Sequence, residues 1–116
     1  MLSKKYRLGT EREISCIMRT GKTGVGPFFI LKWIPNNKEN SRFVFIVSTK
    51  VDKRAVIRNK IQRQFREVVA RNLSKLKGNF DIAMIAKSKS INVSFEDINN
   101  SFYQILAKNK LITESK

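Results

Sequence analysis

The chain has 116 residues, of which 24 are basic and 9 are acidic, giving a formal net charge of +15 and a pI near 10.5. This length supports one hydrophobic core, and a hydrophobic share of 41% is typical of a folded domain. With no histidine and a single cysteine, the chain lacks the residues for a zinc site, a disulfide or a histidine-based catalytic centre.

The charge favours a polyanionic partner, which is RNA, DNA or an anionic membrane. No apolar run is long enough to span a bilayer, and the N-terminus has no apolar core typical of a secretory signal. We therefore expect a cytoplasmic protein with no membrane partner. The sequence shows no linker or internal repeat, so we expect residues 1–116 to form a single nucleic-acid-binding domain.

The first predicted element is a short amphipathic helix that starts after Thr10. Glu13, three residues later, completes a capping box, and Gly21 ends the helix. Apolar residues follow at helical spacing: Ile14, Ile17 and Met18. Residues 21–27 are rich in glycine and predict a flexible connector.

Two strands come next, at 28–34 and 42–50, because both segments are rich in aromatic and β-branched residues. A short polar loop separates them, which predicts an antiparallel hairpin. A third, largely buried strand is predicted at 80–86. Strands on either side of a long helix imply a crossover connection packed on one face of the sheet.

The long helix is predicted over 51–77, with Asp52 as its cap and Gly78-Asn79 at its end. Ser94 is predicted to cap a final amphipathic helix. The fold class is therefore α+β: one small domain with a mostly antiparallel sheet of three to four strands packed by helices. The expected element order is α-β-β(-β)-α-β-α.

The long helix is also the most basic part of the chain. Between Lys50 and Lys77 there are ten basic and two acidic residues, a local net charge of +8. Arginine binds phosphate through a planar fork, and asparagine can contact a base edge or a 2′-hydroxyl. The predicted contacts are Lys50, Lys53, Arg54, Arg58, Asn59, Lys60, Arg63 and Arg66. We expect Arg58 and Arg63 to face solvent, and the alternative is an ordinary solvated cationic face.

At these residues the sequence resembles the protein component of bacterial ribonuclease P. The likeness rests on Val47-Ser48-Thr49-Lys50, on the run Ala55-Val56-Ile57-Arg58-Asn59-Lys60-Ile61-Gln62-Arg63, and on Arg66-Glu67. It extends to Tyr6-Arg7-Leu8 and to residues 81–86. Lys60, Gln62 and Thr49 depart from the family pattern, so charge is partly kept and bidentate geometry partly lost.

The resemblance implies a protein subunit of ribonuclease P that assists removal of the 5′ leader from precursor tRNA. A catalytic RNA performs the cleavage with Mg²⁺ held mainly by the RNA, and this chain contributes no catalytic residue and no metal ligand. The implied partners are the catalytic RNA and precursor tRNA, with no protein partner required. The family fold also implies a left-handed βαβ crossover through the long helix.

The resemblance further implies a cleft for the leader between the first helix and the sheet. The candidate cleft residues are Ile14, Met18, Lys32 and Ser48. Ile14 and Met18 stand where the family carries two phenylalanines, so apolar contact would replace base stacking. Both side chains are equally compatible with a role in the core.

Other functions remain open from the residues alone. A structural RNA-binding protein, such as a ribosomal component with no role in cleavage, would also carry a basic helix. A DNA-binding protein is less consistent, since no helix-turn-helix pair is recognisable. A stand-alone nuclease would need a carboxylate cluster to hold catalytic metal, and the acidic residues are scattered.

Overall fold

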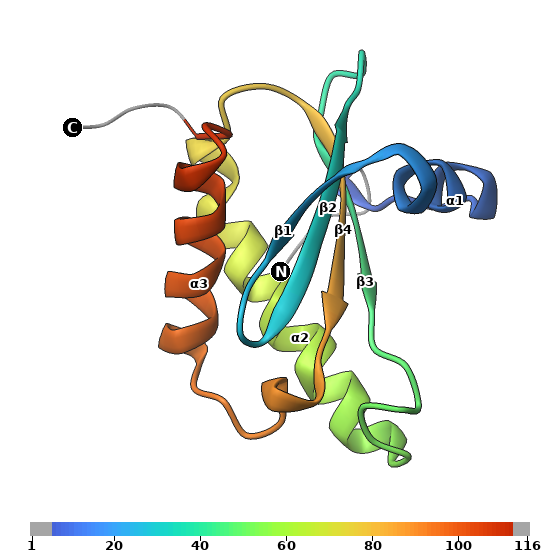
Figure 1. The fold of residues 1–116 in the computed structure, drawn as a ribbon, viewed down its shortest axis with the longest axis vertical. Helices are drawn as coiled ribbons and strands as arrows, with labels where there is room; N and C mark the ends of the chain where they lie inside the picture. The colour runs from blue at the N-terminus through green and yellow to red at the C-terminus, as the bar shows by residue number, and fades with distance from the viewer. Residues whose placement is uncertain (1–5, 113–116) are drawn as a thin grey trace.

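The computed structural model describes residues 6–112, which form three α-helices around one four-stranded sheet (Figure 1). The elements are α1 (Glu11–Thr20), β1 (Lys22–Val25), β2 (Phe29–Pro35), β3 (Arg42–Ile46), α2 (Ala55–Asn72), β4 (Phe80–Ala86) and α3 (Phe95–Lys108). Short 3₁₀ turns follow α2 at Leu73–Lys75 and β4 at Ser88–Ser90. The predicted α+β class and element order are confirmed.

The sheet order is β1-β2-β4-β3, and β2 is antiparallel to both of its neighbours. The predicted hairpin between 28–34 and 42–50 is therefore wrong, because β4 lies between β2 and β3. The turn that does form a hairpin is the preceding one, where the Gly26 N–H donates to the Phe29 carbonyl at 2.9 Å. The segment predicted as a connector is thus largely an edge strand, β1.

A glycine in β1 explains how α3 reaches this edge of the sheet. A Cβ added at Gly24 would lie 2.6 Å from Cγ2 of Ile105, a residue of α3. Real Cβ atoms do not approach another carbon so closely, so a larger residue would push the helix away from the strand. Glycine here serves close packing rather than flexibility.

The strands β3 and β4 run parallel and are joined through α2. In Figure 1 both strands point downward, β4 lies to the left of β3, and α2 passes behind the sheet, which is the left-handed sense. This arrangement agrees with the crossover that the family resemblance implies and departs from the usual right-handed rule.

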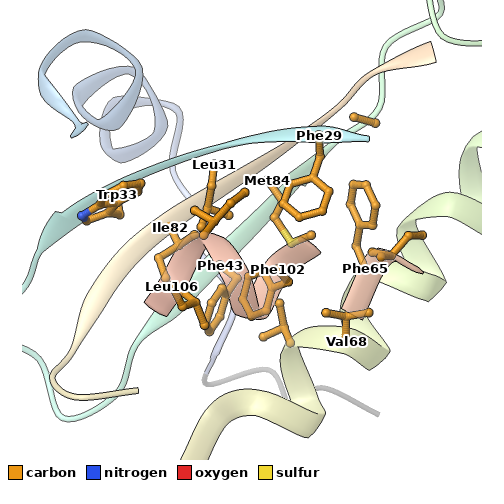
Figure 2. Packing of buried hydrophobic residues seen from close by; sticks show 14 of the residues in the cluster. Phe29, Leu31, Trp33, Phe43, Phe65, Val68, Ile82, Met84, Phe102 and Leu106 are labelled. Atoms are coloured by element: carbon orange, nitrogen blue, oxygen red, sulfur yellow. The ribbon is translucent and has the colours of Figure 1, made fainter. Parts of the chain in front are cut away.

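The two faces of the sheet have separate apolar cores. Alternate residues of β2, β4 and β3 pack with α2 and α3 in the larger core, where the Phe29 and Phe65 rings meet edge to face at 5.6 Å (Figure 2). On the other face, Ile17 of α1 and Leu8 pack against Ala83 of β4. Helix α1 covers this second face through its contacts with β2 and β4.

The N-caps predicted from the sequence are confirmed for two of the three α-helices. Thr10 and Ser94 accept hydrogen bonds from the N–H groups of Glu13 and Asp97, as predicted. The cap of the long helix is Arg54, so the assignment of Asp52 as the cap is wrong. Asp52 instead accepts a hydrogen bond from the Arg54 N–H at 2.8 Å, in a turn that precedes the helix.

The long helix also ends earlier than predicted, at Asn72 rather than next to Gly78. The buried Asn72 side chain donates to the Val68 carbonyl at 2.7 Å and to the Asn99 side chain of α3 at 2.9 Å. Beyond it the backbone N–H of Lys77 donates to the Leu111 carbonyl. Pairing with the chain after α3 thus replaces the last predicted helical turn.

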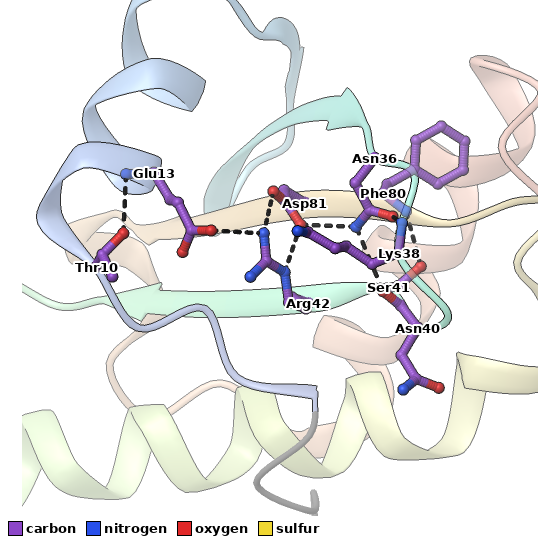
Figure 3. Close-up of polar contacts among 9 residues, drawn as sticks. All are labelled: Thr10, Glu13, Asn36, Lys38, Asn40, Ser41, Arg42, Phe80 and Asp81. Carbon is purple, nitrogen blue, oxygen red and sulfur yellow. Dashed lines mark hydrogen bonds and ion pairs between the residues drawn. The ribbon is translucent and has the colours of Figure 1, made fainter.

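A polar network fixes α1 against the sheet (Figure 3). Arg42 of β3 donates from Nε and Nη2 to both carboxylate oxygens of Asp81, at 3.0 and 2.9 Å, and also pairs with Glu13 of α1 at 2.9 Å. Asn36 donates to the same Asp81 at 2.7 Å. Burial of Glu13 raises its pKa, but hydrogen bonds from Arg42 and Thr10 outweigh this and leave the pKa below its ordinary value.

Candidate nucleic-acid interface

The outward face of α2 carries cations with no acidic partner. Asn59, Lys60 and Arg63 are exposed, and Arg66 is half-buried. Within residues 6–112, no carboxylate lies within ion-pair distance of Lys60, Arg63 or Arg66, whereas Arg71 one turn later pairs with Glu67 at 3.2 Å. The opposite face of the helix buries Ile61, Phe65, Val68 and Val69 in the core. The amphipathic pattern therefore fixes these cations toward solvent.

The first turn of α2 differs, because its two arginines are held by the protein itself. The Arg54 guanidinium forms a two-pronged ion pair with Asp52, and these hydrogen bonds lower the pKa of Asp52 to about 2. Arg58 donates from Nη1 to the backbone carbonyls of Asp52 and Lys53, at 3.1 and 2.8 Å. Arg58 is half-buried, so the expectation that it simply faces solvent is wrong. Its first role is to hold the turn that precedes the helix.

The loop between β3 and α2 presents two further predicted cations. Lys50 and Lys53 are both exposed. Ser48 organises the loop: its Oγ accepts from the Lys50 N–H at 3.2 Å, and its carbonyl accepts from the Val51 N–H at 3.0 Å. Lys50 and Lys53 of this loop, like Lys60, Arg63 and Arg66 of α2, form no ion pair within residues 6–112.

The sheet face next to α1 carries a row of apolar residues outside both cores. The register places one residue of each strand side by side: Val25, Ile30, Ile85 and Ile46. Val25 is 66% exposed and the other three are partly exposed. We call these four residues the apolar strip. A row of this kind offers a flat surface on which nucleobases could pack, although it contains no aromatic ring.

The four predicted cleft residues differ in exposure and packing. Met18 is 40% exposed, but Ile14 packs against the smaller core. Lys32 lies in the next row of the same sheet face and donates to Thr23 Oγ1 at 2.9 Å. Ser48 is exposed two residues beyond Ile46. Lys32 and Ser48 thus lie close to the strip along their strands, Met18 is exposed on α1, and Ile14 is taken up in packing.

Sequence reasoning missed the strip itself. Its four residues are unremarkable β-branched positions, and they become a row only in the observed register. The predicted hairpin placed the wrong strands together, and β1 was not expected as a strand. The only signal available was the alternation within each strand.

None of the helices within residues 6–112 has the length and apolar character needed to cross a membrane. The fold and the charged helix together define a small basic α+β protein with a surface suited to a polyanion.

Comparisons with known proteins give the family. The family model described as Ribonuclease P matches residues 2–110. A ribonuclease P protein component of Syntrophomonas wolfei is 36% identical over 108 residues, covering 93% of this chain and 90% of the relative. One of Fusobacterium nucleatum is 34% identical, covering 86% and 93%. The chain belongs to the ribonuclease P protein family and is thus the accessory protein of a ribonucleoprotein endoribonuclease.

Solved structures support the same assignment. The RNase P protein of Staphylococcus aureus superposes with a TM-score of 0.82 at 27% identity, covering 93% of this chain and 98% of that one. The RNase P protein of Thermotoga maritima gives a TM-score of 0.79 at 26% identity, covering 94% and 98%. The α+β fold is shared along nearly the whole chain.

Proposed function

We propose that residues 1–116 act as one RNA-binding domain that binds the catalytic RNA and the 5′ leader of precursor tRNA. The observation that carries the proposal is the group of cations on the outward face of α2 that have no acidic partner among residues 6–112. The proposed RNA contacts are Lys50, Lys53, Arg54, Arg58, Asn59, Lys60, Arg63 and Arg66. The proposed surface for the leader consists of the apolar strip together with Met18, Lys32 and Ser48.

In this proposal the RNA performs the endonucleolytic cleavage with Mg²⁺. Among residues 6–112, no group of three or more cysteine and carboxylate side chains is placed to hold a metal ion, and the proposal assigns the Mg²⁺ to the RNA. Its own contribution is to neutralise phosphates and to hold the leader. We propose that it does so in the cytoplasm, with no second protein.

Arg63→Ala tests the helix assignment. Arg63 is exposed and has no ion pair within residues 6–112, so its loss should leave the fold intact. A charge-assisted contact to phosphate contributes about 1.5–3 kcal/mol, so affinity for the catalytic RNA should fall roughly ten- to 150-fold. Equilibrium binding and circular dichroism of the same sample measure both quantities.

The matched control is Arg12→Ala, which removes the same charge from the exposed side of α1. It should weaken binding much less than Arg63→Ala, because a distant charge acts only through the screened field of the whole protein. Equal losses in the two variants would mean that net charge alone, and not α2, determines the affinity.

Met18→Phe tests the proposed leader surface. Met18 is 40% exposed, so a ring can be accommodated there without displacing the core. Stacking on an aromatic contributes about 1–3 kcal/mol per base, so the variant should bind precursor tRNA more tightly while its affinity for mature tRNA stays constant. The ratio of the two affinities is the measurement.

Ile14→Phe is the contrasting variant, because Ile14 packs against Leu8, Ile17 and Ala83. Added ring volume there should cost about 1–3 kcal/mol of stability without raising the affinity ratio. If Met18→Phe leaves the ratio unchanged and keeps its melting temperature, the leader does not lie beside Met18.

A further inference from the structure

A small cavity opens at the outer edge of β3, between the start of the described chain and α2. Its volume is about 170 Å³, and its lining residues are Arg7, Leu8, Phe43, Val44, Phe45 and Arg66. Two of these six residues are arginines, and they come from segments far apart in the sequence. The cavity is separate from the apolar strip, which involves none of these residues.

The cavity exists because the edge of β3 is only partly covered. Arg7 pairs with Phe43 in a parallel bridge, and the Leu8 N–H donates to the Phe43 carbonyl at 2.8 Å. In a strand, the backbone N–H and carbonyl groups of every second residue point to the same side, so those of Phe45 face the same edge as those of Phe43. The Phe45 carbonyl accepts from the Gln62 side chain at 3.2 Å. The Phe45 N–H therefore lies on the same open edge, as a donor beside the cavity.

The guanidinium of Arg66 is positioned by an aromatic ring. Its Cζ lies over the Phe45 ring, 6.0 Å from the centroid. Phe45 is in turn packed against Phe65, with their centroids 6.5 Å apart. A guanidinium that lies over a ring contacts it through its face, while its N–H groups point outward in its plane. The contact therefore orients Arg66 and leaves its N–H groups available for hydrogen bonds. Phe45 is a positioning residue for Arg66.

Within the described part of the chain, neither arginine has a carboxylate partner. Arg42, Arg54 and Arg71 each form an ion pair, whereas Arg7 and Arg66 form none with any residue of 6–112. Two cations lining one cavity repel each other, and an anion between them removes this repulsion. Phosphate suits such a pair, since its oxygens can accept from two planar forks and a backbone N–H together.

We propose that this cavity is a phosphate site for RNA, in which Arg7 and Arg66 grip one phosphodiester of the RNA strand that contacts α2. The inference rests on the proposed function and adds Arg7 to the interface. Arg63 and Arg66 are three residues apart on α2, so they lie on neighbouring turns of one side of the helix. An RNA backbone that passes Arg63 can therefore continue to the edge of β3.

A double-mutant cycle tests the shared phosphate. The variants are Arg7→Ala, Arg66→Ala and their combination, each measured for affinity to the catalytic RNA at one fixed salt concentration. Each single change should weaken binding on the order of tenfold. Because both residues hold the same phosphate, the double variant should be weakened by clearly less than the product of the two single effects.

Two further variants keep the test independent of folding. Arg66→Lys and Arg7→Lys keep the charge and lose the planar fork, so they should retain the melting temperature and recover only part of the affinity. Arg12→Ala, which removes an exposed charge that does not line this cavity, should have a much smaller effect than Arg7→Ala.

The possible failures can be told apart. If the wild-type protein binds the catalytic RNA and Arg7→Ala binds as tightly as Arg12→Ala, the phosphate site is refuted while the proposed function stands. Strictly multiplicative effects of Arg7→Ala and Arg66→Ala would also refute it, since they would indicate separate contacts. A wild-type protein that does not bind this RNA would overturn the proposed function itself.

Discussion

Raising the monovalent salt concentration from 50 to 200 mM should weaken binding of this protein to the catalytic RNA by roughly 10²- to 10⁴-fold. Six of the proposed contacts are cations with no ion pair among residues 6–112: Lys50, Lys53, Arg58, Lys60, Arg63 and Arg66. If five to eight phosphates are neutralised, the logarithm of the affinity should fall with the logarithm of salt with a slope of about −4 to −7.

The slope is measured by titration across this salt range at constant Mg²⁺. Arg63→Ala should make it shallower by about one, and Arg12→Ala should leave it almost unchanged. A wild-type slope close to −1 would mean that one phosphate at most is neutralised. The unpaired cations of α2 would then not be the main source of affinity.

Asp81→Ala should destabilise the protein by about 3–5 kcal/mol, which lowers the melting temperature by roughly 10–25 °C. The Asp81 side chain is 8% exposed, and it holds both prongs of the half-buried Arg42. Removing the carboxylate leaves Glu13 as the only ion-pair partner of the half-buried Arg42 guanidinium within residues 6–112. It also removes the acceptor of the 2.7 Å hydrogen bond from Asn36. Thermal unfolding followed by circular dichroism gives the shift.

Two control substitutions separate the effect of losing a buried carboxylate from the effect of losing a negative charge. Glu13→Ala removes the more exposed partner of Arg42, with 31% of its side chain accessible, and should cost on the order of 1 kcal/mol or less. Glu39→Ala removes an exposed carboxylate that forms no ion pair within residues 6–112 and should change stability by at most about 0.5 kcal/mol. Equal effects of all three substitutions would contradict the role assigned to the buried pair.

The network around Arg42 also links the fold to the site. Arg42 joins β3 to β4 through Asp81 and joins α1 to the sheet through Glu13. Because Met18 lies on α1, loosening this network should disturb the distance between Met18 and the apolar strip. A functional effect of Asp81→Ala is therefore expected to act through the position of α1.

Local chemistry made several elements predictable from the sequence. The capping groups of Thr10 and Ser94 act within three residues, and β4 occupies 80–86 as its apolar run indicated. The apolar stripe of α2 buries Ile61, Phe65 and Val68 as helical periodicity requires. In each case the cause is contained in a short stretch of chain.

Strand pairing was not predictable in the same way. The runs at β2 and β3 are apolar whichever strand lies beside them, so nothing in them indicated that β4 would separate them. The glycines of residues 21–27 suggested a loop, yet Gly24 pairs with Leu31 in a strand, and its missing side chain leaves room for Ile105 of α3. The apolar strip follows from this register, so it could not be seen before the register was known.

The charged site was predictable in composition but not in detail. The sequence indicates which residues on α2 are cationic, and burial confirms that Asn59, Lys60 and Arg63 face solvent. It does not indicate that Arg58 is tied to the carbonyls of residues 52 and 53, since those contacts depend on the turn before the helix. The cavity at Arg7 was likewise not predictable, because it depends on the bridge between Arg7 and Phe43.

The most direct test of a role in 5′ leader removal is to measure cleavage of precursor tRNA by the bacterial catalytic RNA at low Mg²⁺, with and without this protein. We expect the protein to increase the rate of leader removal, protein freed of RNA to cleave nothing, and Arg63→Ala to reduce the stimulation. Tight binding of the RNA with no change in the cleavage rate would contradict this role and would indicate a purely structural RNA-binding protein.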